Sequence, residues 1–392
     1  MRPIYFDYAA TTPVDGQVAE KMMAYLTRDG EFGNPASRSH LLGWMAEEAV
    51  EDARNEVADL IQADSREIVW TSGATEANNL AIKGVAENYA PADCHLITCA
   101  TEHKAVLDPF KYLQSRGYSI TILAPDASGT VSAAAIAAVI TEQTRLVSIM
   151  AVNNETGVCN PIGEIGALCA EKGIYFHVDA AQAIGKIALD VQSAQVSLLS
   201  MSAHKFYGPK GMGALYVRRR SPLNLVAQIH GGGHERGMRS GTLPTHQIVG
   251  MGAAAKILNA GFNDEATRIT GLRDRLMHAL LQLGDVSING GAARRVPGHL
   301  NVCFHGVDGE ALMLAVRNLA LSTGSACTSA SIEPSFVLKA MGLSDQAAHS
   351  SLRLSLGRYT TEADVDGAIL SLTEAVNSLR KLASSNKDTN HE

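Results

Sequence analysis

The sequence predicts an α/β fold: a mostly parallel sheet with helices on both faces, followed by a smaller α+β C-terminal domain. Between about residues 38 and 250, strand-like apolar runs alternate with segments of helical periodicity. Such alternation is typical of parallel sheets that helices cover on both sides. Beyond about residue 260 the alternation stops. A chain of 392 residues is long enough to build two hydrophobic cores.

The first predicted elements are a long helix and a short strand. Leu42, Met45, Ala49 and Ala53 recur at helical spacing, so we expect an amphipathic helix over 38–62. A strand is then expected over 68–70, and the turn at 71–76 leads into a helix ending near Tyr89. The further strands are predicted at 95–99, 118–123, 145–152, 174–178, 196–201 and 213–217. The further helices of this region are predicted at 104–115, 132–141 and 162–172.

The C-terminal part is predicted to change architecture. Strand 213–217 follows strand 196–201 so closely that we expect this pair to be antiparallel. The elements expected after it are helices at 244–260 and 264–283, strands near 299–305 and 351–356, and a helix at about 361–383. The predicted domains are a large domain over 15–260 and a small domain formed by 1–14 and 261–383. The polar tail over 384–392 is expected to be disordered.

Composition excludes several classes of protein. A hydrophobic content of 46% with 19% charged residues is typical of soluble globular proteins, and no apolar run approaches membrane-spanning length. The net charge of -7 argues against direct nucleic-acid binding, and we interpret the basic run at 218–220 as a solvated strand end. Six cysteines without a CxxC pair fit a reducing compartment. We therefore expect a cytoplasmic enzyme without a membrane or nucleic-acid partner.

A lysine at a strand end marks the first candidate site. Lys205 follows the predicted strand 196–201, and Asp179 and Gln182 follow the strand before it. A lysine amine can form an imine with the aldehyde of pyridoxal phosphate, and an acid can hold the pyridine nitrogen protonated. A lone lysine is usually a surface residue. The neighbouring acid and amide favour the cofactor interpretation here.

Cys327 is the second candidate. It lies within 322–331, a run of Ser, Thr, Gly, Ala and Cys residues with little apolar area to bury. Most cysteines are inert buried groups, and the apolar neighbours of the other five fit that description. A thiol on a mobile segment together with an imine-forming lysine predicts sulfur chemistry on an amino acid.

Other ligand signatures are weaker. The turn at 71–75 lies between a strand and a helix, where free backbone N–H groups can bind a phosphate or simply cap the helix. No dinucleotide fingerprint G-x-G-x-x-G follows the first strands. A Walker loop is also absent, because Gly185-Lys186 would need a glycine five residues before Gly185, where Ala180 stands. The histidines show no metal-binding spacing, so no permanent metal is expected. His103 still lies at a strand-to-helix junction, where sheet enzymes place ligands.

Ordered motifs along the chain resemble those of the cysteine desulfurases, fold type I pyridoxal-phosphate enzymes of the class V aminotransferase group. The resemblance covers about 4–383. Its motifs are 6–12, 71–76, 102–103, 153–157, 179–182, 202–205, 236–242, 325–329 and 350–353. The long segment around Cys327 resembles the housekeeping subgroup that feeds iron–sulfur assembly.

The resemblance implies a role for each matching residue. Lys205 holds the cofactor as an imine, Asp179 pairs with the pyridine nitrogen and Gln182 with the ring hydroxyl. His103 stacks on the ring and shuttles protons. The residues implied to hold the phosphate are Ala74, Thr75, Ser202 and His204, with Thr242 reaching the phosphate of a neighbouring subunit. The residues implied to bind the substrate carboxylate are Asn154 and Arg353.

The implied reaction converts L-cysteine to L-alanine and leaves a persulfide on Cys327. The implied partners are a second copy of the chain, an iron–sulfur scaffold and other sulfur acceptors, including those of tRNA thiolation. Cys327 is then a transient ligand of a nascent cluster at most. Two departures stand out. Ala203 occupies a position where glycine is common, and the chain ends in a polar stretch after Leu382 where relatives carry a longer aromatic tail that docks the scaffold.

Three alternatives remain at this stage. Selenocysteine lyases and class V aminotransferases share the cofactor site, although an aminotransferase needs no nucleophilic thiol. A catalytically idle scaffold with the same fold is the third, and the presence of Lys205, Asp179 and Cys327 argues against it.

Overall fold

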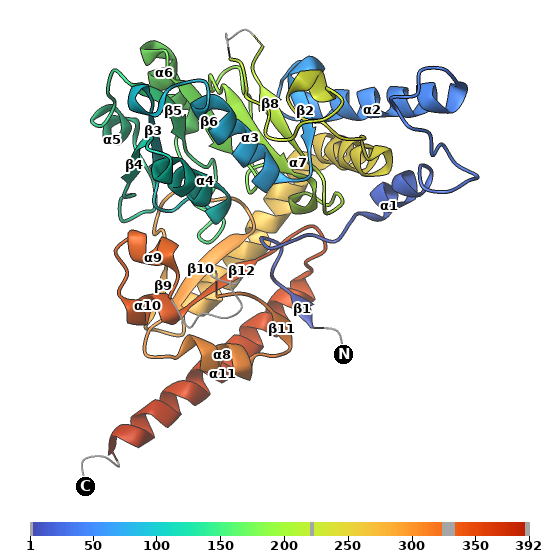
Figure 1. The fold of residues 1–392 in the computed structure, drawn as a ribbon. Coiled ribbons are helices and arrows are strands. Elements are labelled where there is room, and N and C mark those ends of the chain that lie inside the picture. The colour runs from blue at the N-terminus through green and yellow to red at the C-terminus, as the bar shows by residue number, and fades with distance from the viewer. Residues whose placement is uncertain (1–2, 220–222, 324–333, 389–392) are drawn as a thin grey trace.

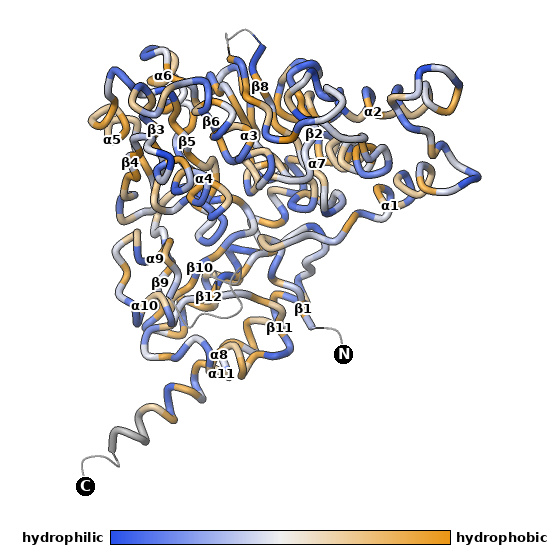
Figure 2. Tube along the Cα trace, in the orientation of Figure 1, coloured by the Kyte–Doolittle hydropathy of each residue, from blue (hydrophilic) through white to orange (hydrophobic). Residues whose placement is uncertain are grey.

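A computed structural model describes residues 3–219, 223–323 and 334–388, with a seven-stranded sheet at the centre of the larger part (Figure 1). The strand order is β2-β8-β7-β6-β5-β3-β4. The strands are β2 (Ile68–Thr71), β3 (His95–Cys99), β4 (Ser119–Leu123), β5 (Thr144–Ser148), β6 (Tyr175–Asp179), β7 (Leu198–Ser202) and β8 (Gly213–Val217). Figure 2 shows hydrophobic stretches along β4, β5 and β8, as expected where helices cover a sheet.

Strand direction decides where the loops of this sheet meet. The pairs β3–β4, β3–β5, β5–β6 and β6–β7 are parallel, whereas β8 is antiparallel to both β7 and β2. The antiparallel pairing predicted for 213–217 is thus confirmed. Because β2 and β7 are each antiparallel to β8, which lies between them, β2 runs in the same direction as β7. The carboxyl ends of β2, β3, β5, β6 and β7 therefore lie at one edge of the sheet.

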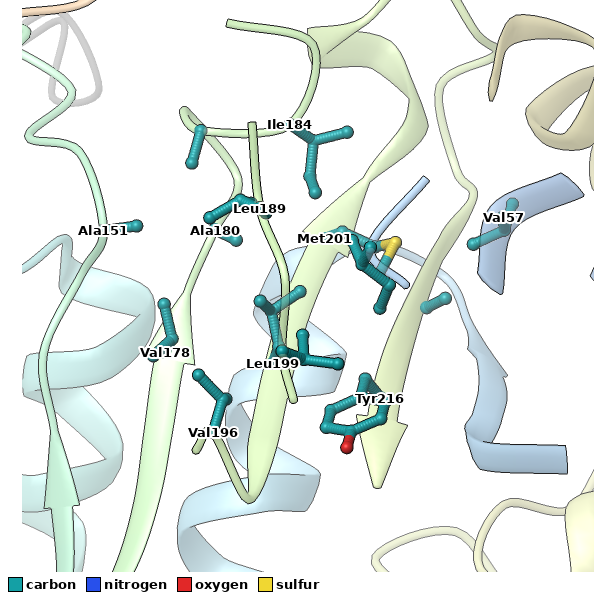
Figure 3. Packing of buried hydrophobic residues seen from close by; sticks show 14 of the residues in the cluster. Val57, Ala151, Val178, Ala180, Ile184, Leu189, Val196, Leu199, Met201 and Tyr216 are labelled. Atoms are coloured by element: carbon teal, nitrogen blue, oxygen red, sulfur yellow. The ribbon is translucent and has the colours of Figure 1, made fainter. Parts of the chain in front are cut away.

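Alternating side chains along the strands build a separate core on each face. On β7, Leu198 belongs to the core formed with α3 and α4, and Leu199 belongs to the core on the opposite face. Leu215 and Tyr216 of β8 divide in the same way. Figure 3 shows Leu199, Met201 and Tyr216 pointing into the second core. Truncation of a fully buried leucine such as Leu199 to alanine would cost about 2–5 kcal/mol.

The helices follow from this division. Those that pack on the first face are α3 (Ala74–Ala86) and α4 (Lys104–Ser115), and those on the second are α2 (Leu41–Asp59), α6 (Ile162–Lys172) and the first half of α7 (Thr245–Leu281). The short helices of this part are α1 (Gly16–Met23) and α5 (Ala133–Ala137). The predicted layering, with helices on both faces of a mostly parallel sheet, is confirmed.

The smaller part has its own core around a three-stranded antiparallel sheet in the order β12-β10-β9. Its strands are β9 (Val286–Ile288), β10 (His299–Phe304) and β12 (Ser351–Ser355), with β1 (Ile4–Tyr5) and β11 (Leu319–Ala320) pairing beside them. Its helices are α8 (Gly309–Ala315), α9 (Phe336–Ala340), α10 (Asp345–His349) and α11 (Glu362–Asp388). Phe6 from the N-terminal segment is buried in this core with Leu276 and Phe304. The exact domain boundaries stay a prediction.

Two expectations differ from the structure. The helices predicted at 244–260 and 264–283 form the single 37-residue helix α7. Its first half packs in the large core through Met251 and its second half in the small core through Leu276, so burial at both ends outweighs the cost of Gly261 in the middle, about 1 kcal/mol. A Cβ added at Gly261 would meet no atom within 4 Å, so close packing does not require glycine at this position.

The second difference is the C-terminal tail. Disorder was expected over 384–392, but α11 continues to Asp388. Extending an existing helix costs far less than nucleating one, and α11 is already anchored by Leu372 and Val376 in the small core. Residues 389–392 lie outside the described part. Across the described ranges, no helix is both long and apolar enough to cross a membrane.

Candidate active site

The loops at the shared edge of the large sheet enclose a pocket of about 440 Å³. Chain segments that follow β2, β3, β5, β6 and β7 all contribute to its walls, as expected of a ligand site at the carboxyl ends of parallel strands. The predicted site residues that line it are Ala74, Thr75, His103, Asn154, Asp179, Gln182, Ser202, His204, Lys205 and Arg353. The loops of the large sheet therefore supply most of the cavity wall, and Arg353 is contributed by β12 of the smaller part.

Asp179 is the last residue of β6, and its carboxylate is held rigidly. Oδ2 accepts a hydrogen bond from Asn78 Nδ2 at 2.8 Å, and Oδ1 accepts from the backbone N–H of Ala181 at 2.9 Å. Asn78 comes from α3 and is fully buried. Sequence reasoning missed Asn78, although a polar residue one turn after Thr75 on the buried face of a predicted helix is a recognisable signal.

Lys205 stands beside Asp179 because β6 and β7 are parallel neighbours, with Asp179 opposite Ser200. It follows β7 in a short 3-10 turn. Its Nζ donates hydrogen bonds to the carbonyl oxygens of Ala9 and Ala10, each at 2.8 Å. The N-terminal segment, which carries the motif at 6–12, is therefore part of the site wall.

The amino end of α3 faces the pocket without a capping side chain. Its N-cap is Gly73, whose φ of +151° is a conformation that residues with a side chain rarely adopt. A Cβ there would come within 3.8 Å of Ser202 Oγ, on the pocket side of the turn. The N–H groups of Ala74 and Thr75 and the positive end of the helix dipole are thus available to an anion.

His204 lies next to this anion site. One ring nitrogen, Nδ1, is 3.1 Å from Thr11 Oγ1. Burial, together with the positive charges of Lys205 and Lys210, lowers the pKa of His204 to about 4. An uncharged imidazole remains able to donate one hydrogen bond to a phosphate oxygen.

His103 is the N-cap of α4. Its Nδ1 accepts a hydrogen bond from the backbone N–H of Ala105 at 3.1 Å. In the neutral ring the proton must then reside on Nε2, so this nitrogen is the one that can exchange a proton with a bound molecule. His103 lines the pocket, and its stacking on the cofactor ring stays a prediction.

Arg353 and Asn154 occupy the opposite end of the cavity. Arg353 Nη1 donates to the carbonyl oxygen of Asn154 at 3.0 Å, and Nη2 donates to Asp7 Oδ1 at 2.8 Å. Arg353 Nε and Asn154 Oδ1 are buried and have no hydrogen-bond partner among the described residues. A buried donor and a buried acceptor at one end of a pocket favour a polar ligand there.

Two buried carboxyl groups near the pocket were not assigned a role by sequence reasoning. Burial raises the pKa of Glu102 well above its usual value, reinforced by the charge of Asp179, although the N–H of Met150 opposes the shift. Burial also raises the pKa of Glu155, whose Oε2 accepts a hydrogen bond from Ser335 at 2.5 Å. Glu102 precedes His103 in the sequence, and Glu155 follows Asn154. This adjacency to predicted site residues is the sequence signal that could have identified both carboxyl groups.

Two predicted residues are placed differently from the rest. Cys327 lies outside the described residues, as does most of 322–331. Thr242 is exposed and does not line the pocket of its own chain. Its expected contact with a neighbouring subunit stays a prediction.

The residues present fit pyridoxal phosphate. The pocket combines an uncapped helix amino end for the phosphate, a fixed carboxylate for the pyridine nitrogen and a lysine amine for the aldehyde. The unpaired Arg353 Nε is a donor that matches a substrate carboxylate.

Comparison with known proteins agrees with this assignment. Residues 4–367 match the family model described as aminotransferase class-V. The cysteine desulfurase IscS of Shewanella woodyi is 60% identical over 381 residues, which are 97% of this chain and 94% of that protein. The IscS of Shewanella baltica (strain OS223) is 58% identical over the same share of each chain.

Solved structures give the same result. A NifS-like protein superposes with a TM-score of 0.89 at 36% identity, covering 97% of this chain and 100% of its own. A structure described as SspA in complex with cysteine matches with a TM-score of 0.81 at 41% identity, covering 91% and 99%. This chain therefore belongs to the aminotransferase class-V family, among its pyridoxal-phosphate-dependent cysteine desulfurases.

Proposed function

We propose that this enzyme converts L-cysteine to L-alanine and transfers the sulfur to Cys327 as a persulfide. The observation that carries the proposal is the single pocket in which Lys205, Asp179 and Arg353 converge at the carboxyl edge of the sheet. A lysine with only a surface role would not require Asp179 and Arg353 in the same pocket. The fixed Asp179 and the unpaired Arg353 Nε support the assignment.

Each residue has a role that its position supports. When bound, pyridoxal phosphate supplies an aldehyde for the substrate amine and a ring that accepts electrons from the substrate carbon. Asp179, fixed by Asn78 and Ala181, presents a negative charge toward the ring nitrogen. Arg353 holds the substrate carboxylate, which orients the Cα–H bond toward the Lys205 amine. Lys205 removes that proton, and His103 can hold or release one at Nε2.

The sulfur step balances in atoms and electrons. The Cys327 thiolate attacks the sulfur of L-cysteine, so an S–S bond forms while the bond from sulfur to the substrate β-carbon breaks. The electron pair of that bond stays on carbon and is protonated, which yields L-alanine. The two thiols and one C–S bond become a persulfide and a methyl group, and no external oxidant is required.

A homodimer and transfer to an iron–sulfur scaffold or other acceptors complete the proposal. Large apolar side chains are exposed along 23–44, the segment that contains the end of α1 and the start of α2. They are Met23, Leu26, Phe32, Leu41, Leu42 and Trp44. Contiguous exposed apolar residues of this size favour a protein interface, and a second copy is the partner that the assignment of Thr242 requires. The cytoplasmic location remains a prediction.

Peptide mapping by mass spectrometry tests the function. After brief exposure to L-cysteine, one sulfur atom should be added at Cys327 and L-alanine should be released. Cys327→Ser should abolish both products over multiple turnovers while L-cysteine still changes the cofactor spectrum, since Lys205 and the pocket are intact. Sulfur appearing instead on Cys94, Cys99, Cys159, Cys169 or Cys303 would overturn the proposal.

A further inference from the structure

Lys186 is a buried lysine that the proposed reaction does not use. It follows Gly185 on the turn after β6, and it is largely but not completely buried, in the wall of a small cavity that Lys205 also lines. Its Nζ lies 2.5 Å from Gln182 Oε1. Among the described residues Lys186 forms no ion pair with any carboxylate. A lysine buried without a counter-charge is rare, because burial of an unpaired charge is costly.

The side-chain amide of Gln182 is held at both ends. Its Nε2 donates to the carbonyl oxygen of Ala9 at 2.8 Å, and its Oε1 accepts from Lys186. A backbone carbonyl can only accept, so the nitrogen end must face Ala9 and the oxygen end must face Lys186. One N–H of Gln182 satisfies Ala9, and its second N–H remains for a ligand of the pocket that Gln182 lines.

The surroundings of Lys186 are positive rather than negative. Burial lowers the pKa of Lys186 well below its usual value, and the charges of Lys205 and Arg353 lower it further. This environment destabilises the charged ammonium, but the ammonium and the neutral amine both carry N–H groups that can donate to Gln182. Lys186 therefore serves Gln182 as a hydrogen-bond donor, and an electrostatic role toward an anion is disfavoured.

A small cavity lies on the other side of Lys186. Its volume is about 30 Å³, and its walls include Lys186, Lys205 and His299. His299 is buried, and neither of its ring nitrogens has a hydrogen-bond partner among the described residues. A cavity of this size has room for one water molecule.

We propose that Lys186 is a positioning residue that fixes the orientation of the Gln182 amide, so that its N–H, and not its carbonyl oxygen, faces the ring oxygen of the bound cofactor. The inference rests on the proposed function, because it assumes that Gln182 contacts that ring. Without Lys186, Gln182 Oε1 is a buried acceptor with no donor, and rotation of the amide would place that oxygen against the carbonyl of Ala9. Either outcome weakens the contact with the cofactor.

The test measures cofactor binding to the apoprotein, independently of turnover. Lys186→Met keeps an unbranched side chain only one atom shorter and removes the donor. We expect pyridoxal phosphate to bind roughly two- to twelvefold more weakly, the range of one neutral hydrogen bond. Lys186→Gln, which keeps an N–H donor on a shorter chain, should lie between Met and the parent. Lys172→Met, at an exposed lysine, is the matched control and should bind as the parent does.

A double-mutant cycle shows whether the effect passes through Gln182. Gln182→Ala should weaken binding, and Lys186→Met added to it should cause little further loss. The pH midpoint of the bound cofactor's absorption should also move in the same direction in Lys186→Met as in Gln182→Ala, since both disturb the donor to the ring oxygen. A purely structural defect would lower thermal stability without reproducing that spectral shift.

The outcomes separate this inference from the function on which it rests. A parent that forms no adduct between pyridoxal phosphate and Lys205 would overturn the proposed function and the inference together. A parent that binds normally, with Lys186→Met and Lys186→Gln both binding like the parent, overturns the inference alone. Equal losses from Lys186→Met with and without Gln182 overturn it too.

Discussion

Replacement of Arg353 by lysine tests how the enzyme recognises its substrate. Arg353 uses Nη1 to hold the carbonyl of Asn154 and Nη2 to hold Asp7, and its Nε remains buried without a partner. A lysine ammonium is a single point charge that cannot make these two contacts and also bind a carboxylate in bidentate geometry. Arg353→Lys keeps the positive charge, so the change isolates the geometry of recognition.

The expected magnitude follows from the bonds that are lost. A hydrogen bond to a charged group contributes about 1.5–3 kcal/mol. At about 1.4 kcal/mol per factor of ten, the loss should lower kcat/KM for L-cysteine roughly 10- to 200-fold. Arg353 also lies against Asn154, which lines the same end of the pocket, so the true value should fall toward the upper end of this range.

The assay compares two amines. Alanine formation gives kcat/KM for L-cysteine, and the change in cofactor absorption gives the affinity for L-cysteine and for cysteamine, which lacks the carboxylate. Affinity for cysteamine should be the same in Arg353→Lys and in the parent. Arg275→Lys, at an exposed arginine, is the control for the substitution itself. An equal loss for both amines, or a loss below threefold for L-cysteine, would refute the assignment.

Three further predictions concern the cofactor site and the sheet beneath it. Lys205→Ala should abolish the covalent cofactor adduct and all desulfuration; a borohydride-stable adduct at another lysine would contradict this. Asp179→Asn should lower turnover roughly 100-fold or more, because the neutral amide cannot stabilise the protonated ring and its NH2 group must face either Asn78 or Ala181, both donors. Alanine formation at the parental rate would show that Asp179 has another role. Burial lowers the pKa of His177 from 6.5 to about 3, so its contribution to stability is complete above pH 6.5 and is lost as the pH falls from 6.5 toward 3. At pH 5 the loss should be about 2 kcal/mol, and urea unfolding at pH 7 and 5 should show a smaller pH effect in His177→Gln; an unchanged pH effect would exclude His177 as the cause.

The sequence by itself determined the main layers and most of the site. Apolar periodicity predicted every strand of the large sheet, and the polar residues that matter follow those strands directly. Since parallel strands place their carboxyl ends at one edge, Asp179 and Lys205 had to lie side by side once β6 and β7 were neighbours. The motif residues that line the pocket were therefore accessible to sequence reasoning.

Contacts between distant segments were decided only by the tertiary structure. Asn78 reaches Asp179 across 101 positions, and Lys205 reaches Ala9 across 196. No local pattern encodes such pairs, because each residue satisfies its own helix or strand equally well without the other. The same holds for Lys186, whose spacing from Gln182 predicts a neighbour but not its position in the wall of an internal cavity. Helix α7 shows the limit most clearly: the sequence predicted two helices, at 244–260 and 264–283, and packing against two cores makes them one continuous helix.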